Sequence, residues 1–380
     1  MSRLLPGDSQ TYSKAPSCYP KGAPSRAISA HGAWVTTEDG RCMVDCVNGL
    51  GSVILGHAHP VVQDAVNGVS GNNLPLPSPL EEEMAHELCG CLTWDGVESV
   101  RYGKNGADVT GAAVRLARAV TGRDHLVYTG YHGHHPWSMG DPPMNGGVTV
   151  AERATSHKIL YGDLGALECA LTHWSVAAFV TEPIVSANPD VVAGFEYWET
   201  ARELCTRHGA LLIIDEMVTG FRMAPGGGVE VLGIRPDIAC YGKAMANGYP
   251  LSAIVGPYDI LRRFEVDVFY STTHGGEQTS LAAGLATLRT LRKTDALSCI
   301  HAFDAELRRA AISATHDRDI VIGYRGRPVF RHDASQAEQI VAHGVLYQGY
   351  INLSLAHVTD EDARARLLTA FGADREAVAS

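Results

Sequence analysis

The fold of this chain is decided by the stretch Leu211-Leu-Ile-Ile-Asp215-Glu216-Met-Val-Thr-Gly-Phe-Arg222. Four consecutive apolar residues, followed by a carboxylate and then by a glycine turn, are typical of a strand that is buried on both faces of a parallel sheet. Open sheets of this kind bind their ligands at the carboxyl ends of the strands, which is where Asp215 would lie. An isolated Asp at a strand end more often caps the next turn. Asp215 therefore indicates a site only if other functional residues lie near it.

A second apolar run brings a lysine to the same edge of the expected sheet. Ile238-Ala-Cys-Tyr241 predicts another buried strand, and Gly242 and Lys243 follow it directly. Partial burial lowers the pKa of a lysine and frees its nucleophilic amine, so Lys243 is a candidate for forming a Schiff base. Asp215 and Lys243 therefore become the two leading candidates for chemistry.

Short apolar runs alternate with helical patterns along the middle of the chain, and this alternation predicts an α/β fold with a mainly parallel central sheet flanked by helices. The predicted strands are residues 99–102, 125–128, 177–181, 210–214, 238–241 and 252–255. The predicted helices include residues 61–69, 80–92, 113–121, 197–208 and 278–291.

The two ends of the chain lack the alternation of strands and helices that is predicted for its middle. Residues 1–30 are rich in Pro, Ser and Gly and predict an extended arm, and the alternating pattern around Asp39-Gly40 predicts a β-hairpin. Near the other end, residues 350–355 predict a strand. We therefore expect three segments: an N-terminal arm and hairpin at 1–47, a large ligand-binding domain at 48–288, and a C-terminal part of a smaller α+β domain at 289–380.

Composition favours a soluble globular protein, with a small molecule as the default substrate. The chain has 380 residues, 45% of them hydrophobic and 19% charged, with a net charge of −11. Acidic and basic residues are mixed, so no basic stripe indicates nucleic acid or an anionic membrane. The start lacks the apolar run of a signal peptide, and no apolar stretch is long enough to span a membrane. Nine scattered cysteines fit reduced thiols, and we expect a cytoplasmic protein.

The two decisive stretches together resemble a known family. Asp215-Glu-Met-Val-Thr-Gly-Phe-Arg222 followed by Pro236-Asp-Ile-Ala-Cys-Tyr-Gly-Lys243 is similar to the class III, fold-type I enzymes that use pyridoxal 5'-phosphate (PLP), and within them to the glutamate-1-semialdehyde 2,1-aminomutase branch. Further segments agree in order and spacing: Gly56-His-Ala-His-Pro60, Arg115–Arg123, Tyr131-His-Gly-His134, Thr181-Glu-Pro183, Thr273-His-Gly-Gly276 and Ala282–Leu288.

The resemblance implies a role for each residue around the cofactor ring. Lys243 would hold PLP as a Schiff base and then move the proton between the substrate Cα and the cofactor. Asp215 would pair with the pyridinium nitrogen, Tyr131 would stack on the ring, and Met217 would pack on its other face. His132 belongs to the same motif as Tyr131 and is expected to contact the cofactor.

The phosphate of the cofactor would lie against Asn105-Gly106-Ala107, which precedes a predicted helix. Ala107 stands where relatives carry Thr or Ser, so a phosphate-binding hydroxyl is missing. Thr273 would reach the phosphate from the other subunit, which implies a homodimer with shared active sites. Glu182, at the end of a buried strand, is either a cofactor or substrate contact or a structural ion pair.

Histidines and cysteines also occur in clusters that invite a metal site. His132, His134 and His135 share one loop, but they lack the separated spacing and the carboxylate or thiolate partners of a structural zinc site. The pairs Cys42 and Cys46, and Cys89 and Cys91, fit packing better than zinc. We expect no metal.

The reaction is less narrowly defined than the cofactor. Val218 stands where ornithine and GABA aminotransferases carry Gln, which favours the aminomutase-like branch, whereas Ile184-Val-Ser-Ala-Asn188 and a short lid at residues 136–157 depart from true aminomutases. The leading hypothesis is amino-group transfer on a small amino or carbonyl substrate, between molecules or within one. PLP-dependent decarboxylation or racemisation of an amino acid, even one carried on a larger molecule, is the alternative. A non-catalytic binding protein is a third, motivated by Ala107.

Overall fold

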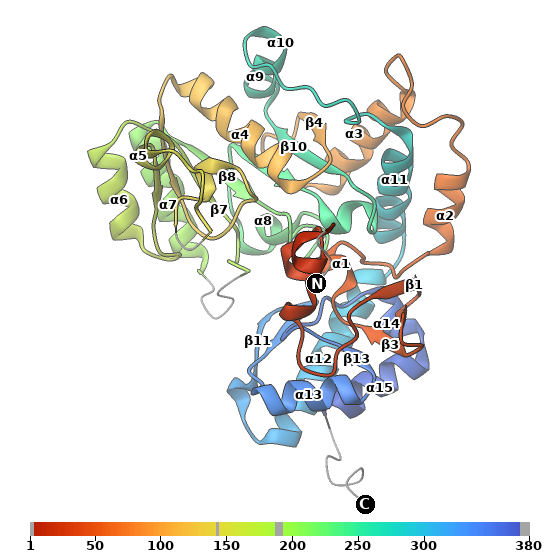
Figure 1. The fold of residues 1–380 in the computed structure, drawn as a ribbon. Coiled ribbons are helices and arrows are strands. Elements are labelled where there is room, and N and C mark those ends of the chain that lie inside the picture. Colours follow the sequence, from red (N-terminus) through yellow and green to blue (C-terminus); the bar gives the residue numbers. More distant parts are fainter. Residues whose placement is uncertain (1–3, 142–143, 187–192, 373–380) are drawn as a thin grey trace, which may run out of the picture. The chain divides into compact units, whose positions relative to one another are not determined.

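The computed structural model describes residues 4–141, 144–186 and 193–372. The chain forms two compact units, one made of Met1–Asp64 with Lys293–Ser380 and the other of Ala65–Arg292 (Figure 1). The division therefore falls at residues 64 and 293, whereas the sequence suggested 47 and 288. Residues 48–64 belong with the chain ends because Asn48 Nδ2 donates to the carbonyl of Asn352 and Leu355 N donates to that of Ile54.

The larger unit is built on a seven-stranded sheet in the order β4-β10-β9-β8-β7-β5-β6. Neighbours among β9, β8, β7, β5 and β6 are parallel, and β10 runs antiparallel to both β9 and β4. The prediction of a mainly parallel sheet is confirmed. The strands are β4 (Ser99–Gly103), β5 (His125–Tyr128), β6 (Ser156–Lys158), β7 (Val176–Thr181), β8 (Leu211–Asp215), β9 (Ile238–Tyr241) and β10 (Ser252–Gly256).

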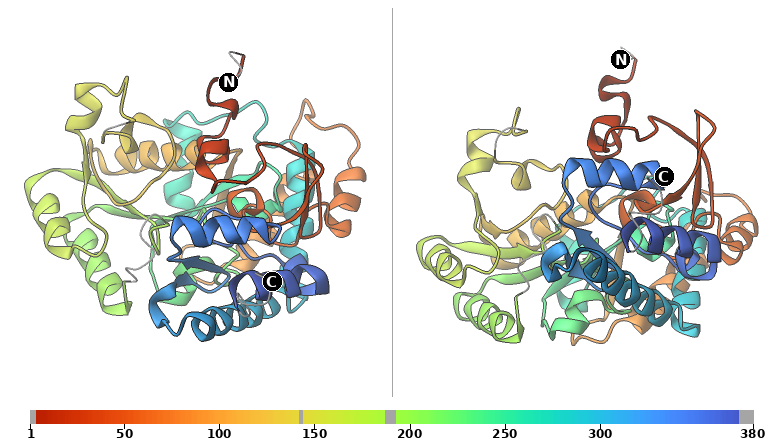
Figure 2. Two further views of the ribbon diagram at one scale, coloured as in Figure 1. Left: turned by 60° about the horizontal axis from the view of Figure 1, so that its bottom comes forward. Right: turned by 90° about the horizontal axis from the view of Figure 1, so that it is seen from below.

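The central strands are buried on both faces. Ile213 of β8 packs in a core with α4 (Gly106–Thr121), whereas its neighbours Leu212 and Ile214 point to the opposite face, and all three are fully buried. This arrangement explains why the strand reads as an unbroken apolar run. Helices surround the sheet (Figures 1 and 2). They are α3 (Pro79–Cys91), α5 (Val150–Ala154), α6 (Leu164–His173), α7 (Phe195–His208), α8 (Gly227–Leu232), α9 (Tyr258–Leu261), α10 (Arg263–Val266) and α11 (Gln278–Lys293).

The smaller unit contains a four-stranded sheet, β1-β2-β3-β13, and a separate hairpin, β11-β12. The hairpin predicted around Asp39-Gly40 is confirmed, because β2 and β3 pair antiparallel and Gly40 takes φ +83° in the turn. The strands are β1 (Ala27–His31), β2 (Trp34–Thr37), β3 (Cys42–Asp45), β11 (Val321–Tyr324), β12 (Arg327–Phe330) and β13 (Val345–Leu346).

The helices of the smaller unit are α1 (Asn48–Gly51), α12 (Ala296–Thr315), α13 (Ala334–Ala342), α14 (Leu355–Thr359) and α15 (Glu361–Phe371). The 20-residue α12 packs against α14 and α15, and Figure 2 shows the three together. A further helix, α2 (Pro60–Asn67), spans the division between the two units. Three 3-10 turns lie at Pro6–Asp8, Tyr12–Lys14 and Pro16–Cys18.

The predicted strand at residues 350–355 is wrong. Ile351, Asn352, Leu353 and Ser354 are buried, yet their N–H groups go to scattered acceptors instead of one ladder. Asn352 N donates to Cys46 O, Leu353 N to Gly326 O and Ile351 N to Pro328 O. The apolar pattern therefore marked burial correctly, but several partners satisfy the backbone here.

Candidate active site

Asp215 and Lys243 lie at the ends of neighbouring parallel strands. Asp215 is the last residue of β8 and pairs in register with Cys240 of β9. β9 ends one residue later at Tyr241, and Lys243 opens the short 3-10 helix that follows. The carboxylate and the amine are thus delivered to the same edge of the sheet.

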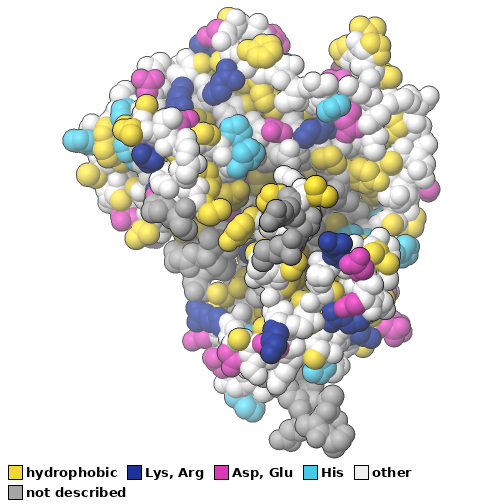
Figure 3. Space-filling view, viewed as in Figure 1, with side chains coloured by type: hydrophobic (Ala, Val, Ile, Leu, Met, Phe, Trp, Pro, Cys, Tyr) yellow, Lys and Arg dark blue, Asp and Glu magenta, His cyan; other side chains and the backbone are white. Residues whose placement is uncertain are grey.

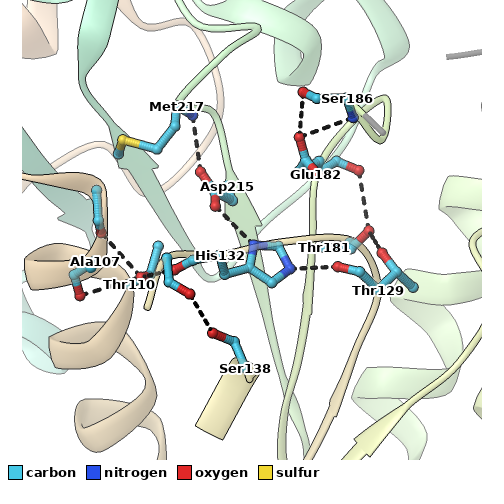
Figure 4. A network of polar contacts seen from close by, with 12 residues as sticks. Ala107, Thr110, Thr129, His132, Ser138, Thr181, Glu182, Ser186, Asp215 and Met217 are labelled. Carbon is cyan, nitrogen blue, oxygen red and sulfur yellow. Dashed lines mark hydrogen bonds and ion pairs between the residues drawn. The ribbon is translucent and has the colours of Figure 1, made fainter. Parts of the chain in front are cut away.

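The carboxylate of Asp215 is held by two donors. Its Oδ2 lies 2.8 Å from Nδ1 of His132, and its Oδ1 accepts the backbone N–H of Met217 at 3.0 Å (Figure 4). Asp215 is only 4% exposed. These contacts fix the plane of the carboxylate while leaving each oxygen a lone pair for a further donor.

His132 is enclosed on every side. Its Nε2 donates to the carbonyl oxygen of Thr129 at 2.5 Å, and its ring stacks on Trp137 with centroids 5.7 Å apart. Burial lowers the pKa of His132, but the hydrogen bond and the charge of Asp215 outweigh burial and raise it overall. A carbonyl can only accept, so Nε2 carries a proton, and an ionised Asp215 requires a second proton on Nδ1.

Glu182 adds a second buried carboxylate at the end of β7. Burial, with a further contribution from Asp215, raises the pKa of Glu182. Its Oε2 accepts both the hydroxyl of Ser186 at 2.6 Å and the N–H of the same residue at 3.2 Å. In the described part of the chain no cation forms an ion pair within 4 Å of Glu182, which disfavours the structural ion pair among its two readings.

Met217 joins the segments that surround the site. A Cβ on Gly106 would lie 3.1 Å from the Met217 side chain, and one on Gly242 would lie 2.7 Å from its sulfur. The start of α4, the turn after β8 and the loop before Lys243 therefore meet at this methionine. A side chain at either glycine would push the Met217 side chain away from its place, more so at 242 than at 106.

The start of α4 forms a turn that is organised by one carboxylate. Asp108 organises it, because its Oδ2 accepts the N–H of Lys104 at 3.0 Å and that of Asn105 at 2.8 Å. Ala107 is packed beneath Gly133, whose Cβ would lie 2.7 Å from the Ala107 side chain. The hydroxyl of Thr110 faces inward, 2.8 Å from the carbonyl of His132. This hydroxyl binds main chain, so it offers no proton to a ligand.

Tyr131 and Thr273 stand apart from this network. Tyr131 is 60% exposed, and burial of part of its ring, together with the charge of Asp215, raises the pKa of its hydroxyl. Thr273 is exposed in the turn before α11. Neither side chain contacts Asp215 through a hydrogen bond in the described residues. The structure thus gathers His132, Glu182, Asp215 and Met217 around the start of α4 and leaves these two at the surface.

Several residues of the site carried no sequence signal. Thr129, Trp137 and Ser186 hold His132 or Glu182, and Lys104 forms a buried ion pair with Glu277 next to the α4 turn. Their partners lie far away in sequence or on the backbone, so only the folded chain shows the contacts. Residues 187 and 188, part of the segment that departs from aminomutases, lie outside the described residues.

The histidine loop continues past the site with His134 and His135. His134 and His135 stack on each other with centroids 5.2 Å apart. Among the residues that the structure describes, no group of three or more His, Cys, Asp or Glu side chains is arranged to hold a metal ion. The same residues include no helix that is both long and apolar enough to cross a membrane.

The site fits PLP by the chemistry of its groups. A lysine amine suits the aldehyde, a fixed and buried carboxylate suits the pyridinium nitrogen, and a glycine-containing helix start suits the phosphate. Gly106 has no side chain, which allows a ligand to approach the backbone at the start of α4 closely. Helices around a mainly parallel sheet, with this pair at adjoining strand ends, define a fold-type I PLP-dependent enzyme.

Comparison with known proteins places the chain more closely. Residues 21–330 match the family Aminotransferase class-III, and the chain belongs to this family. It is 35% identical to the glutamate-1-semialdehyde 2,1-aminomutase of Nitratidesulfovibrio vulgaris over 315 residues, 79% of this chain and 72% of that protein.

Solved structures of similar proteins support the same family assignment. The FumI protein of Sphingopyxis sp. MTA144, in its PLP internal aldimine form, superposes with a TM-score of 0.88 at 28% identity over 97% of this chain and 92% of that one. A glutamate-1-semialdehyde aminomutase from Pseudomonas aeruginosa gives a TM-score of 0.80 at 25% identity, covering 93% and 88%. The family resemblance and the fold class are confirmed, and the chain is a PLP-dependent enzyme of the aminotransferase or aminomutase type.

Proposed function

We propose that Lys243 and Asp215 carry amino-group transfer on a small amino or carbonyl substrate. The observation that supports this most is their placement at the ends of the paired strands β9 and β8, with the Asp215 carboxylate fixed by His132 at 2.8 Å. When bound, PLP supplies an electron sink that stabilises negative charge developing at the substrate Cα.

Asp215 holds the proton on the ring nitrogen. A buried carboxylate favours a nearby cation, so Asp215 would hold the protonated ring nitrogen when the cofactor is bound. His132 sets the direction of this carboxylate, and Thr129 and Trp137 set the direction of His132. The chain thus prepares the geometry of the acceptor before the ligand arrives, and no reorganisation is needed during reaction.

Lys243 has two roles at one place. Its amine would hold the cofactor through the aldehyde group, and the same amine, placed beside the substrate Cα, would accept and return a proton there. Lys243 sits between buried neighbours, because Gly242 and Ala244 are both buried. Exclusion of water around the amine protects the proton being transferred.

The phosphate would be bound by the backbone N–H groups at Gly106 and Ala107, aided by the dipole of the 16-residue α4. Thr273 of a second copy would complete the site, which makes the protein a homodimer. The exposed surface beside Thr273 supports this: Phe269 is 78% exposed, next to a cavity of about 760 Å³ that is also lined by Arg115 and Trp137. Size-exclusion chromatography with light scattering tests it, and a monomer at micromolar concentration would refute it.

The cofactor assignment is tested by colour. Purified protein supplied with PLP should absorb visible light as a lysine-bound cofactor, and Lys243→Ala should lose this band. Lys158→Ala is the matched control, because Lys158 forms a surface ion pair with Asp141 and should leave the band unchanged. A wild-type protein that stays colourless at saturating PLP would overturn the proposal.

A second measurement shows whether the amino group is transferred between two molecules or within one. Each of a set of amine donors is added alone, and the pyridoxamine form of the cofactor and the products are followed by absorbance and mass spectrometry. Conversion of a single amino aldehyde without any donor indicates transfer within one molecule, as the names of the aminomutase relatives describe. Carbon dioxide release without the pyridoxamine form would refute amino-group transfer and select decarboxylation.

We also infer a cytoplasmic location. All nine cysteines are free, and Cys46, Cys91, Cys205 and Cys240 are buried. Burial raises the pKa of the Cys91 thiol to about 11 and that of Cys205 to about 12, which keeps both unreactive. Free thiols in this number suit a reducing compartment, and fractionation of the native host with thiol labelling tests the inference.

A further inference from the structure

A largely buried ion pair joins the turn before α4 to the turn before α11. Nζ of Lys104 lies 2.7 Å from Oε1 of Glu277, and the two side chains are only 14% and 8% exposed. Both oxygens of Glu277 also accept the N–H of Ser280, at 3.1 and 3.2 Å, so the same carboxylate caps α11. Burial opposes ionisation of Glu277, but the hydrogen bonds from Lys104 and Ser280 outweigh burial and lower its pKa.

The pair lies where the cofactor's phosphate is expected. Lys104 directly precedes Asn105, the residue before the first turn of α4. Glu277 closes the turn that carries Thr273. The ion pair therefore fixes the Lys104 side chain beside the first turn of α4, where the phosphate is expected, and ties this turn to the one that carries Thr273, the residue proposed above to serve the site of the second copy.

This turn is poor in side-chain donors and rich in negative charge. Ala107 offers no donor, and the hydroxyl of Thr110 is used by the backbone. Asp108 places a carboxylate within the first turn of α4, bound to the N–H of Lys104. A phosphate dianion at this turn would have two carboxylates nearby, those of Asp108 and Glu277. The ammonium of Lys104 pairs with Glu277, while its backbone N–H binds Asp108.

We propose that Lys104 supplies the positive charge that attracts the cofactor's phosphate to the start of α4, and that Glu277 holds this ammonium and attenuates its charge. The proposal rests on the PLP-binding function inferred above and deepens it. If the pair acts through its charge, the two variants change phosphate binding in opposite directions, whereas a purely structural role would weaken binding in both. Removing the cation weakens phosphate binding, whereas removing the anion strengthens it.

The experiment compares PLP with pyridoxal, which lacks the phosphate. Both are titrated into the full-length protein after the cofactor has been removed, and Kd is measured from absorbance. Lys104→Met should raise the Kd for PLP about tenfold or more. The attraction between a unit positive charge and a neighbouring phosphate at a protein surface changes a binding constant by at least that factor. The Kd for pyridoxal should stay within about twofold of wild type, because pyridoxal does not sense the charge.

Glu277→Gln should lower the Kd for PLP by about threefold or more and leave pyridoxal unaffected. A rise in the Kd of both ligands in both single variants would overturn the proposal, because it would show that the pair only supports the fold. Arg202→Met is the matched control: Arg202 pairs with Asp237 at 2.7 Å and is also 14% exposed, but it lies on α7. Its PLP affinity should equal that of wild type.

A single variant that leaves a buried charge unpaired can fail to fold. The double variant Lys104→Met/Glu277→Gln removes both charges and avoids this problem. Compared with Glu277→Gln alone, the double variant isolates Lys104, and it should bind PLP about tenfold more weakly. Equal PLP affinity in these two proteins would overturn the proposal.

Inorganic phosphate gives a second readout that is independent of the aldehyde. Phosphate should raise the Tm of cofactor-free wild-type protein and of Glu277→Gln, and it should have a smaller effect on Lys104→Met; equal effects in all three would count against the role of Lys104. The proposed function fails separately, since in that case wild-type protein would bind neither PLP nor pyridoxal.

Discussion

The imidazole of His132 lies between two acceptors, the carboxylate of Asp215 at 2.8 Å and the carbonyl oxygen of Thr129 at 2.5 Å. With both atoms accepting, the ring is held most firmly as an imidazolium. An otherwise costly buried charge is thereby paired with the Asp215 carboxylate, which was proposed above to face the cofactor ring.

This geometry predicts a pH-dependent contribution to stability. The pKa of His132 is raised, so its stabilising effect is complete below the ordinary value of 6.5 and is lost as the pH rises through the folded-state pKa. In urea unfolding without added cofactor, the stability difference between wild type and His132→Asn should be largest below pH 6.5 and shrink toward pH 9. A difference that grows with pH would contradict the assignment. His134→Asn, on the same loop but outside the network, should show no such trend.

Asp215→Asn should abolish most of the catalytic effect while preserving the shape of the site. An amide cannot stabilise a protonated ring nitrogen, so kcat/KM for the amine half-reaction should fall by about 100-fold or more. Stopped-flow absorbance of the bound cofactor measures this step. Asp237→Asn, which removes a carboxylate bound to Arg202 and to the N–H of Leu212, should leave kcat/KM near wild type. Full activity in Asp215→Asn would sink the proposed role.

Glu216, the neighbour of Asp215, is expected to matter for stability. It is fully buried and accepts the N–H groups of Gly228 and Val229 at 3.1 and 2.6 Å, as well as the hydroxyl of Thr219. Glu216→Ala should cost about 2–4 kcal/mol in urea unfolding, because it leaves buried donors unsatisfied. The exposed Glu230, which accepts the N–H of Gly226, is the control, and Glu230→Ala should cost under about 1 kcal/mol.

Burial raises the pKa of Glu216 to about 7. A carboxyl group with a raised pKa contributes stability that is complete below its ordinary value of 4.5 and is lost as the pH rises through about 7. Wild-type stability should therefore contain a decrease between pH 5 and pH 8 that Glu216→Gln lacks. A pH profile that is identical in the two proteins would contradict this account.

Gly133→Ala tests the packing beneath the phosphate turn. Gly133 has φ +100°, and an added Cβ would lie 2.7 Å from the Ala107 side chain. Gly122→Ala is matched, because Gly122 has φ +67° with nothing within 4 Å of the new Cβ. Both should lose about 1 kcal/mol from backbone strain, and only Gly133→Ala should lose about 1–3 kcal/mol more and bind PLP more weakly. Equal losses would show that the turn tolerates the contact.

Much of the larger unit could be predicted from sequence because its strands are unbroken apolar runs. Residues 125–128 and 238–241 coincide with β5 and β9. β6 was missed because Ser156-His-Lys158 has no apolar run and depends on pairing with β5 at the sheet edge. The antiparallel direction of β10 leaves no local trace, since direction follows from the path of the chain and not from side-chain type.

Only part of the candidate site could be predicted from the sequence. The ends of β8 and β9 put Asp215 and Lys243 in view from the sequence alone, because a polar residue after a buried strand is conspicuous. The partner that orients Asp215 comes from another loop, 83 residues away, and the ion pair of Lys104 spans 173 residues. Contacts of such separation depend on the fold as a whole. The expected charge pattern does hold at the surface, where residues of both signs are interspersed on the face in Figure 3.

The backbone of Lys243 has φ +45°, a left-handed conformation that a residue with a Cβ adopts at a cost of about 1–2 kcal/mol. Glycine would remove this strain, yet glycine has no amine. Stability and catalysis therefore favour different residues at this position. A Lys243→Gly variant should be more stable than the wild type and should lack the amine that the proposed reaction needs. The strained lysine therefore costs the fold about 1–2 kcal/mol at the position where the proposed reaction needs an amine.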